Sequence, residues 1–390
     1  MTKRLWEEAK TVNDLFDEIR DESINIGGID GYKFGSLKEI LRNKRFVFLG
    51  ESSHCVKEYI EAKASLIKYL HQELGFRILA FESELGDCSI GNYLTEELSA
   101  KENMSGSIGK VWQNEFMLDL FEYMKETQQR QPLYLTGVDV QQSMDKHFSS
   151  YMRSHLTGDL RKTFVTFDTR TNEMLDKDYM LKRRFRKTVE EIERIGQGLI
   201  RELEKQTFPS AMLRDVVLQT MKNRLNYFKA NFTKGFSKLF EYRDELMAKN
   251  LEFLSQHVYP DEKFIIWAHN LHIKKQSSVN RFSPYRSFVE NLPEFMKEDS
   301  FVIGLYAGEG RMGDNQGGDH PIKKVNKKHM EWLLSNSPHP NFFIPCASKW
   351  GEKKWKAFEG GGLRISFKPV QQYDGVLFFK KVTPAVVNVE

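Results

Sequence analysis

The chain has 390 residues, of which 40% are hydrophobic and 29% are charged, the composition of an ordinary globular protein. This composition excludes disordered, collagen-like and other low-complexity proteins. The net charge of +4 comes from 58 basic and 54 acidic residues. So small a surplus, spread evenly along the chain, argues against a nucleic-acid partner. The length allows one large domain or two.

The spacing of the cysteines and the lack of a long apolar segment indicate the cellular compartment. Cys55, Cys88 and Cys346 lie far apart and form no C-x-x-C motif. This spacing argues against a disulfide framework and against a thiolate zinc site. The first ten residues lack the apolar core of a signal peptide, and no run of about 18 apolar residues occurs that would span a membrane. We therefore expect a cytoplasmic, monomeric enzyme with no membrane partner.

Six short apolar segments are typical of β-strands, and helical patterns separate them. They span residues 45–49, 76–81, 133–138, 264–267, 301–306 and 375–379. Near-continuous apolar strands that alternate with helices indicate a parallel sheet covered on both faces. We therefore predict an α/β fold with a mostly parallel central sheet flanked by helices.

A long helical hairpin is expected between the third and fourth of these strands. Residues 173–205 carry many charges of both signs, which suits a solvated helix. Ser210 is placed to cap a second helix that runs to about His257. We expect this insertion to form a wall or lid over the site. The expected boundaries are residues 1–165 and 261–390 for the two parts of the catalytic domain and residues 166–260 for the insertion.

Polar residues follow four of the predicted strands at the point where each strand ends. They are Glu51 and His54, Glu82, Asp139, and the pair His269 and His272. The carboxyl ends of the strands meet at the ligand crevice of an open α/β sheet, so we expect these side chains to share one cleft. Each residue alone has a structural alternative, such as a helix cap. Four strand ends with the same pattern favour a catalytic site.

Other residues extend the candidate site. Lys63 lies on the apolar face of a predicted helix, where its ammonium either reaches solvent or serves the site. Residues 308–321 are expected to be a Gly-rich loop, in which Glu309 and Arg311 are candidate substrate contacts. The G-x-G-x-x-G match within this loop leads into no helix, so it is weak evidence for a dinucleotide site. The role of residues 320–390 is open, although His320, Trp350 and Trp355 are candidates for the rim of the cleft.

These motifs resemble those of the erythromycin esterase family. The segment from Gly50 to His54 matches the family's GE-x-x-H motif, and the segment from Trp267 to His272 matches its WAHN-x-H motif. The other matching residues are Gly75, Phe76 and Glu82 of a GF-x-x-x-x-x-E strand, Gly137, Asp139 and Gln141 of a G-x-D-x-Q element, and Trp112, Asn114 and Glu115 of a tryptophan-led helix.

The resemblance implies a hydrolase that opens an ester, which in known members is the macrolactone of 14-membered macrolide antibiotics, with antibiotic resistance as the outcome. It implies that His54 is the general base and that the reaction needs no metal. It also implies that Glu51, Glu82, His269 and His272 accompany His54 in the site. Lys63 stands where family esterases commonly carry Arg, which keeps the charge but loses the planar fork. This difference puts the macrolide substrate in question. We expect Lys63, Asp139 and Asn270 to bind a small-molecule ester.

The mechanism that we hypothesise is attack by water. His54 takes the proton, Glu51 or Glu82 orients its imidazole, and the nearby cations and histidines stabilise the oxyanion. Three alternatives stay open. They are a nucleophile at Ser52, Ser53 or Cys55, a divalent metal on the same residues that acts on a carbohydrate-type ester, and a non-catalytic small-molecule binder. Apart from that metal, no cofactor is expected.

Overall fold

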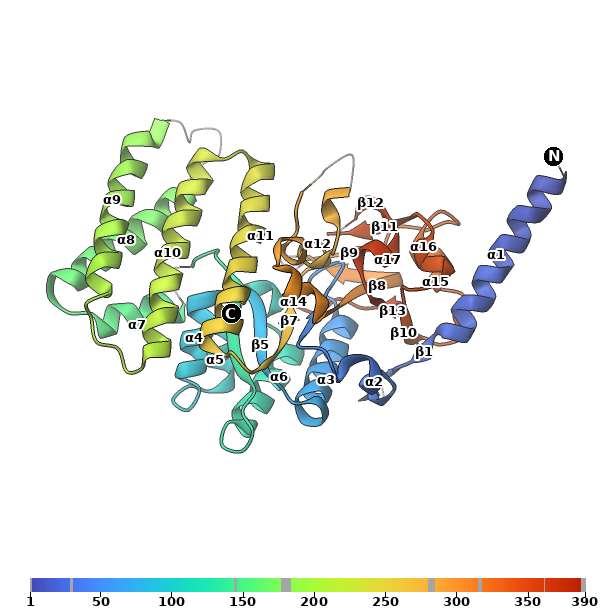
Figure 1. Cartoon of the computed structure of the whole chain (residues 1–390), viewed down its shortest axis with the longest axis horizontal. Helices are drawn as coiled ribbons and strands as arrows, with labels where there is room; N and C mark the ends of the chain where they lie inside the picture. The colour runs from blue at the N-terminus through green and yellow to red at the C-terminus, as the bar shows by residue number, and fades with distance from the viewer. Residues whose placement is uncertain are drawn as a thin grey trace. The chain divides into compact units, whose positions relative to one another are not determined.

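The computed structural model describes residues 2–28, 31–143, 146–176, 184–279, 285–314, 318–360 and 362–386, with side chains from Val12 onward. The chain divides into two compact units. Unit 1 consists of Met1–Arg77, Lys110–Leu120 and Glu262–Glu390, and unit 2 consists of Ile78–Gly109 and Phe121–Asp261. In Figure 1, the blue and the orange-to-red segments belong to unit 1.

Unit 1 contains a mixed, mostly parallel run of six strands. In spatial order they are β1 (Ile24–Asn25), β10 (Asn341–Pro345), β13 (Gly375–Val382), β8 (Ser300–Gly313), β4 (Phe46–Leu49) and β7 (Lys263–Trp267). The last four run parallel, whereas β10 is antiparallel to both β1 and β13. The predicted α/β class is confirmed. Strand β10 was not predicted, because prolines border its short apolar run and read as breaks.

Strand β4 positions the candidate site. All four of its residues are buried, as expected for a strand covered on both faces. It pairs in parallel with β7 on one side and β8 on the other, with Phe46 opposite Phe264 and Ser300. Helix α3 (Lys57–Leu74) follows and ends at Gly75, whose φ of 71° is the left-handed conformation that glycine adopts freely at a helix C-terminus. The ends of β4 and β7 therefore lie side by side.

The remaining elements of unit 1 are mostly short. The helices are α1 (Thr2–Glu22), α2 (Lys38–Leu41), the start of α6 (Glu115–Thr127), α12 (Asn270–Ile273), α13 (Phe288–Asn291), α14 (Glu294–Glu298), α15 (Met330–Leu334), α16 (Lys349–Glu352) and α17 (Pro369–Gln372). The helical turns are η1 (Gly35–Leu37), η2 (Lys110–Trp112) and η5 (Ser277–Val279). Two small hairpins join β2 (Gly27–Gly28) to β3 (Gly31–Tyr32) and β11 (Trp355–Glu359) to β12 (Leu363–Phe367).

Most of the Gly-rich segment forms strands, so the expectation of a loop is wrong for residues 308–313 and 319–321, while residues 315–317 lie outside the described residues. Strand β8 continues to Gly313, and β9 (Asp319–Pro321) pairs back on it in antiparallel fashion. The glycines serve close packing, since a Cβ on Gly310 would lie 2.0 Å from the carbonyl oxygen of Val382 on β13. The G-x-G-x-x-G match therefore lies in a strand, not before a helix.

Unit 2 holds two parallel strands and most of the long helices. Its strands are β5 (Phe76–Glu84), which begins in unit 1, and β6 (Tyr134–Asp139). Its helices are the end of α6, α4 (Leu85–Tyr93), α5 (Ala100–Ser107), α7 (His147–His155), α8 (Gly158–Leu175), α9 (Arg186–Leu203), α10 (Ala211–Thr233), α11 (Phe236–Phe253) and the π-helical turn η4 (Leu254–Val258). Helices α8, α9 and α10 lie side by side around a shared apolar core (Figure 1).

The inserted segment has more helices than the predicted hairpin. Ser210 caps α10 as expected, because its hydroxyl accepts a hydrogen bond from the Leu213 amide. The expected single helix to His257 is wrong, since α10 ends at Thr233 and α11 begins after Gly235. Glycine is a weak helix former and marks that break. Within the other expected helix, residues 177–183 lie outside the described residues, between α8 and α9.

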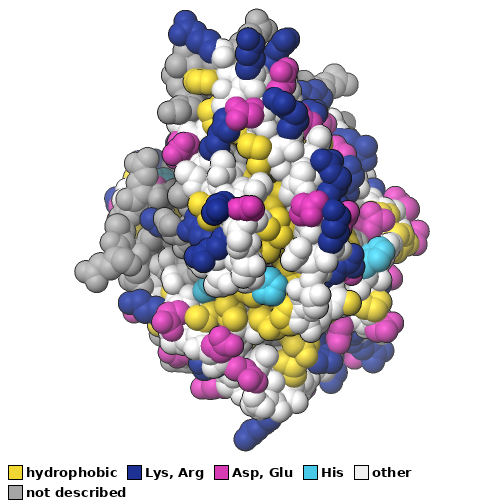
Figure 2. Space-filling model, turned by 90° about the vertical axis from the view of Figure 1, so that its left-hand side faces the viewer, with side chains coloured by type: hydrophobic (Ala, Val, Ile, Leu, Met, Phe, Trp, Pro, Cys, Tyr) yellow, Lys and Arg dark blue, Asp and Glu magenta, His cyan; other side chains and the backbone are white. Residues whose placement is uncertain are grey.

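The charges of these helices are mixed and paired on the surface. Arg170 on α8 binds Glu191 on α9, and Lys229 on α10 binds Glu193 on α9. Figure 2 shows Lys and Arg side chains interspersed with Asp and Glu on the face that it presents. None of the described helices is long and apolar enough to cross a membrane.

Candidate active site

The turn after β4 brings Glu51 beside the start of α12. The backbone amide of Asn270 donates to the carbonyl oxygen of Glu51 at 2.9 Å. A Cβ on Gly50 would lie 2.0 Å from the side-chain oxygen of Asn270, so this approach requires glycine. The GE-x-x-H and WAHN-x-H segments are therefore packed against each other within unit 1.

The Glu51 carboxylate lies in the protein interior and accepts three hydrogen bonds. His54 Nδ1 lies 2.7 Å and Trp112 Nε1 2.8 Å from one oxygen, and Lys63 Nζ lies 2.5 Å from the other. Three donors from three segments of unit 1 thus converge on one acidic group. Their number explains how a buried carboxylate is tolerated, because an unpaired buried charge is very costly.

Lys63 is fully buried and holds the charge that Glu51 needs. Its ammonium lies 3.6 Å from the centre of the Trp267 ring, a cation–π contact inside the protein. Burial by itself would raise the pKa of Glu51, but Lys63 and the hydrogen bond from His54 outweigh burial and lower that pKa to about 2. Of the two interpretations of Lys63, exposure of its ammonium to solvent is therefore wrong.

His54 is the more accessible member of this cluster, with 19% of its side chain exposed against 2% for Glu51. Its ring stands nearly perpendicular to Trp112, with the centroids 5.1 Å apart. Because Glu51 is ionised and accepts only, His54 Nδ1 must donate, which leaves Nε2 as the proton acceptor. The imidazole is thus fixed in the tautomer that a general base needs.

His269 supplies a second imidazole, whose ring nitrogens have the opposite donor and acceptor roles. The two histidine rings lie 5.1 Å apart, so the convergence of the strand ends expected for this pair is observed. His269 Nδ1 accepts a hydrogen bond from the Leu271 amide at 3.1 Å and thereby caps α12. In the neutral ring, Nε2 must then carry the proton. One imidazole offers an acceptor and the other a donor.

Asn270 and His272 of the WAHN-x-H segment are buried. His272 lies on α12, and its amide donates to the carbonyl oxygen of His269. The Asn270 amide group bridges to the Leu305 backbone, donating at 3.0 Å and accepting at 3.3 Å. These bonds favour a role for Asn270 in holding α12 against β8, in place of the expected substrate contact.

The candidate nucleophiles near His54 are poorly placed for that role. The Cys55 thiol donates to the Val111 carbonyl oxygen, and burial together with Glu51 and Asp314 raises its pKa to about 12. Because the thiolate is the reactive form, this cysteine is inert at neutral pH. The Ser52 hydroxyl is hydrogen-bonded to Tyr59 at 3.0 Å, and Ser53 is buried. The geometry therefore favours water as the attacking group.

The same donor set bears on the metal alternative. Both Glu51 oxygens and His54 Nδ1 already take part in hydrogen bonds. A metal on the Glu51 oxygens would share them with Lys63 and Trp112. Over the residues that the structure describes, no group of three or more His, Cys, Asp or Glu side chains is arranged to hold a metal ion.

Glu82 and Asp139 lie at the ends of β5 and β6 in unit 2, where Arg243 of α11 binds both. The guanidinium reaches Asp139 with two bonds of 2.8 Å and Glu82 with one of 3.1 Å. Glu51, one of the two carboxylates expected to orient His54, contacts it directly. Arg243 was missed, because a helical segment rich in charges of both signs gives no signal for a buried arginine.

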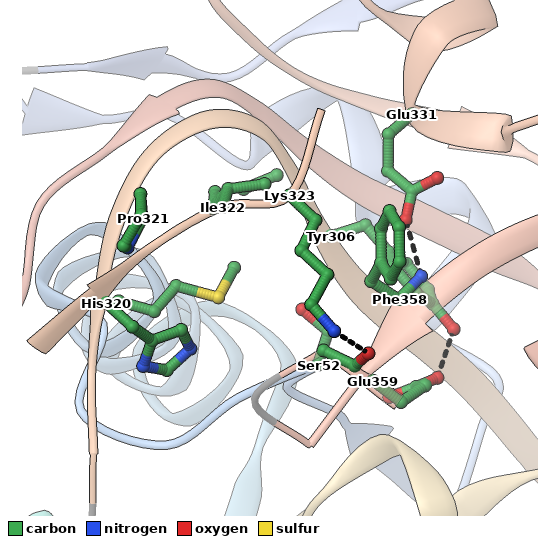
Figure 3. A pocket seen from close by; sticks show the side chains of 12 residues that line it. Ser52, Tyr306, His320, Pro321, Ile322, Lys323, Glu331, Phe358 and Glu359 are labelled. Atoms are coloured by element: carbon green, nitrogen blue, oxygen red, sulfur yellow. Dashed lines mark hydrogen bonds between the residues drawn. The ribbon is translucent and has the colours of Figure 1, made fainter. Parts of the chain in front are cut away.

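Residues mostly from the C-terminal segment line a small cavity of about 30 Å³ in unit 1 (Figure 3). Tyr306 donates to Glu359 at 2.5 Å, and burial raises the pKa of Glu331 to about 7. This volume suits one or two water molecules and no substrate. His320 lines the cavity, whereas Trp350 and Trp355 are buried in the core, so their expected place at a rim is wrong.

Glu309 and Arg311 lie on the exposed part of the β8–β9 hairpin. Arg311 donates from Nε to Asp319 on β9 at 2.8 Å. The hairpin thus gives Arg311 a structural partner, and a contact of either residue with substrate remains a proposal.

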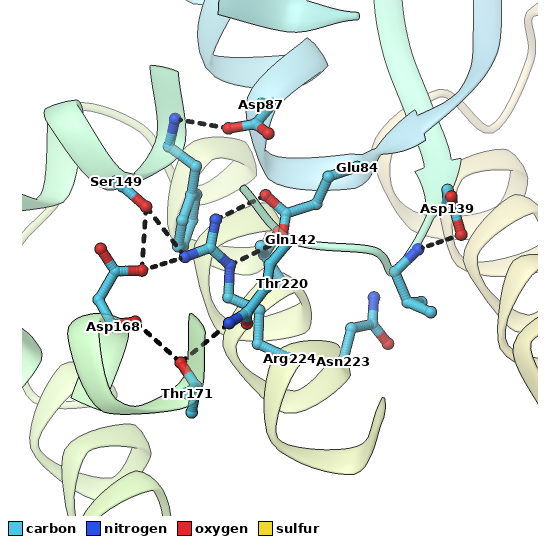
Figure 4. A network of polar contacts seen from close by, with 12 residues as sticks. Glu84, Asp87, Asp139, Gln142, Ser149, Asp168, Thr171, Thr220, Asn223 and Arg224 are labelled. Carbon is cyan, nitrogen blue, oxygen red and sulfur yellow. Dashed lines mark hydrogen bonds and ion pairs between the residues drawn. The ribbon is translucent and has the colours of Figure 1, made fainter. Parts of the chain in front are cut away.

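A second buried ion network ties the helices of unit 2 to β5 (Figure 4). Arg224 donates to both oxygens of Glu84, at 2.6 and 2.7 Å, and to Asp168 at 2.7 Å. All three side chains are essentially inaccessible to solvent. No motif in the sequence indicates this network. Since it anchors α10 and α8 at the end of β5, its role is structural.

Comparisons with known proteins identify the family and the fold. The family model described as erythromycin esterase matches residues 71–382. The protein named "Putative hydrolase YbfO" of Bacillus subtilis (strain 168) is 30% identical, covering 90% of this chain and 86% of its own. Two solved structures share the fold. A succinoglycan biosynthesis protein has a TM-score of 0.78 at 18% identity, covering 96% of this chain and 98% of its own. A mutant of the erythromycin esterase EreC in its open conformation has a TM-score of 0.66 at 14% identity, covering 93% and 98%.

The lowered pKa of Glu51 predicts a pH-dependent contribution to stability. A carboxylate whose pKa falls on folding stabilises the protein above its unfolded pKa, near 4.5, and loses that contribution as the pH falls towards about 2. The stability lost on Glu51→Gln should therefore shrink by on the order of 3 kcal/mol from pH 6 to pH 2. Urea unfolding of both proteins across this range measures it, and a pH-independent difference would contradict the pKa assignment.

The Arg224 network predicts a large difference between two arginine substitutions. Arg224→Leu leaves the buried Glu84 without its cation and removes one of the two arginines that bind the buried Asp168, so it should cost about 3–5 kcal/mol of unfolding free energy. Arg170→Leu, the matched control, breaks an equally bidentate but half-exposed pair with Glu191 and should cost at most about 1 kcal/mol. Denaturant unfolding compares them, and equal costs would refute the role assigned to Arg224.

Proposed function

Since this chain belongs to the erythromycin esterase family, we propose that it hydrolyses a carboxylic ester or macrolactone with a water molecule that His54 activates. The observation that carries the proposal is the 2.7 Å hydrogen bond between Glu51 and His54 Nδ1, which leaves His54 Nε2 as a proton acceptor at an accessible position. The family match and the relative named a hydrolase support hydrolysis in general. The ester and the role of His54 are the proposal.

The proposed reaction begins with proton transfer. His54 Nε2 takes a proton from water as the water oxygen attacks the ester carbonyl carbon. The ionised Glu51 holds the ring in place and stabilises the imidazolium that forms. When the tetrahedral intermediate collapses, the carbon–oxygen ester bond breaks, and His54 returns its proton to the departing alkoxide. One ester and one water give one carboxylic acid and one alcohol.

The negative oxygen of the intermediate needs a donor. His269 is the best candidate, because its Nδ1 accepts from Leu271 and its Nε2 therefore donates from a ring 5.1 Å from His54. Such a preorganised donor is typically worth 10²–10³-fold in rate, about 3–4 kcal/mol. His272 is the second candidate on the same helix. We assign neither a metal nor a cofactor to these steps.

Lys63 acts in this proposal as a positioning residue. It is fully buried and donates to Glu51, so it supports the base instead of contacting substrate. The named relatives include an erythromycin esterase and a succinoglycan biosynthesis protein, so macrolactones and carbohydrate esters are the first classes to test.

Removal of the imidazole at residue 54 tests the proposal. We expect the protein to convert erythromycin, or one of a panel of acetyl and carbohydrate esters, into a product heavier by one water. His54→Ala should lower kcat by about 10²–10⁴-fold, the usual contribution of a general base. His339→Ala, at a partly buried histidine away from this cluster, is the control. Mass spectrometry of the product and steady-state kinetics measure both.

Two further measurements, with EDTA and of ester binding, decide between the alternatives. Activity that survives EDTA supports hydrolysis by His54 without a metal. Activity that is lost with EDTA and recovers with added Zn²⁺ or Mn²⁺ would establish metal-assisted hydrolysis. Saturable binding of esters without product from any of them would identify a non-catalytic binder.

Trp112 offers a test of positioning that leaves the reacting groups in place. Trp112→Phe keeps an aromatic ring beside His54 but removes the 2.8 Å hydrogen bond to Glu51. A hydrogen bond to a charged group is worth about 1.5–3 kcal/mol, so kcat should fall about 10–100-fold with little change in KM. Trp332→Phe, at a tryptophan packed on Phe16, is the control. An unchanged kcat would show that Glu51 is held without Trp112.

A further inference from the structure

A groove of about 660 Å³ lies in unit 1 beside α12 and the β11–β12 hairpin. This volume is within the range of small-molecule sites, about 300–1,000 Å³. All five residues of β12 line the groove, and Leu271 and Lys274 of the α12 segment line it as well. It therefore has room for a substrate, in contrast to the small cavity near Glu359.

The charge of this groove is one-sided. Five cationic side chains line it, whereas no Asp or Glu occurs among the described residues that do so. The five are Lys274, Lys354, Lys356, Arg364 and Lys368. In a chain with nearly equal numbers of bases and acids, such a segregation sets up a local positive field.

Only part of this charge is neutralised within the protein. Lys274 pairs with Glu359 at 3.4 Å, and Lys368 pairs with Glu352 at 3.6 Å. Within the described part of the chain, Lys354, Lys356 and Arg364 have no carboxylate within 4.0 Å. Three uncompensated cations at one groove suit an oxyanion, and the planar fork of Arg364 matches a carboxylate or a phosphate.

Apolar side chains share the groove with these cations. Phe367 is buried, and Leu271, Ile365 and Tyr285 add further hydrophobic surface. An inorganic ion alone would leave this surface wet. The ligand that uses both features has an apolar body and at least one acidic group.

Helix α12 connects the groove to the proposed catalytic residues. His269 caps this helix at its start, and Lys274 follows its last residue. At a rise of about 1.5 Å per residue, the backbone distance between these two positions is roughly 8 Å. The α12 segment therefore borders both the groove and the proposed catalytic residues, so the acyl chain is the part of an ester that we expect to reach the groove.

We infer that this groove binds the carboxylate or phosphate of an organic anion with an apolar body, and that the substrate is an ester with such an acidic group in its acyl part. The second statement rests on the proposed function. A positive groove repels a cationic amine such as the amino sugar of a macrolide, so the inference favours an acidic ester over a macrolide.

Binding is measured first, because it does not depend on catalysis. In calorimetric titrations, 1-naphthyl phosphate and 1-naphthoate should bind at one site, and their affinity should fall as salt is added. Neutral 1-naphthamide should bind at least tenfold more weakly. The relative affinity of the two anions distinguishes phosphate from carboxylate. The double variant Lys356→Gln/Arg364→Gln should weaken anion binding at least tenfold. Lys381→Gln removes an exposed charge outside the groove and should change nothing.

Three results of the titration would overturn the inference. They are absence of anion binding, equal binding of the amide, and unchanged affinity in the double variant. The same titration on His54→Ala should match the unsubstituted protein. A failure of the proposed esterase activity thus leaves the binding test valid.

Ester hydrolysis then tests the substrate class. Mono-4-nitrophenyl glutarate, 4-nitrophenyl valerate and 4-nitrophenyl 4-(trimethylammonio)butyrate carry negative, neutral and positive acyl chains on one leaving group. We expect kcat/KM to fall about tenfold at each step of this series, and the double variant to abolish the preference. Hydrolysis without charge preference would overturn the substrate assignment. Anion binding with no hydrolysis of any ester would support the groove and overturn the proposed esterase.

Discussion

The burial of the Glu51 carboxylate is the constraint on which the rest of the site depends. A charge removed from water must be paired and hydrogen-bonded, or the fold pays several kcal/mol. Here a lysine, a tryptophan and a histidine supply the partners, from α3, from η2 and from the turn after β4. The requirement to satisfy one acid therefore fixes three separate segments of unit 1, and the orientation and tautomer of His54 follow from it.

Part of this arrangement was accessible from the sequence. The short motifs around Glu51, His54 and His269 follow buried parallel strands, and strand topology alone brings such positions together. Lys63 was recognisable as a cation on an apolar helix face, although its partner was not. Arg224 and Arg243 were not recognisable, because their partners lie far away in the sequence and their helices carry many solvated charges. Strand β10 was hidden by its flanking prolines.

Two electrostatic environments share unit 1. Around Glu51 the charge of the acid is balanced by that of Lys63. Along the β11–β12 hairpin the cations outnumber the acids, which suits recognition. Under the two proposals, the groove recognises the charge of the ligand, and His54 lies outside the positive field of the groove. The small net charge of the chain conceals this division, because an average over 390 residues says nothing of where the cations lie.

The missing side chain of Gly50 has a consequence for how activity is judged in such proteins. A single added carbon would meet the Asn270 oxygen at 2.0 Å and push the start of α12 away from β4. That helix carries His269, so this glycine acts as a spacer that sets the gap between the two imidazoles. A homologue could keep every acid and histidine and still lose its alignment through this one position. The presence of the acids and histidines is therefore insufficient evidence of catalysis unless the glycine at this position is present as well.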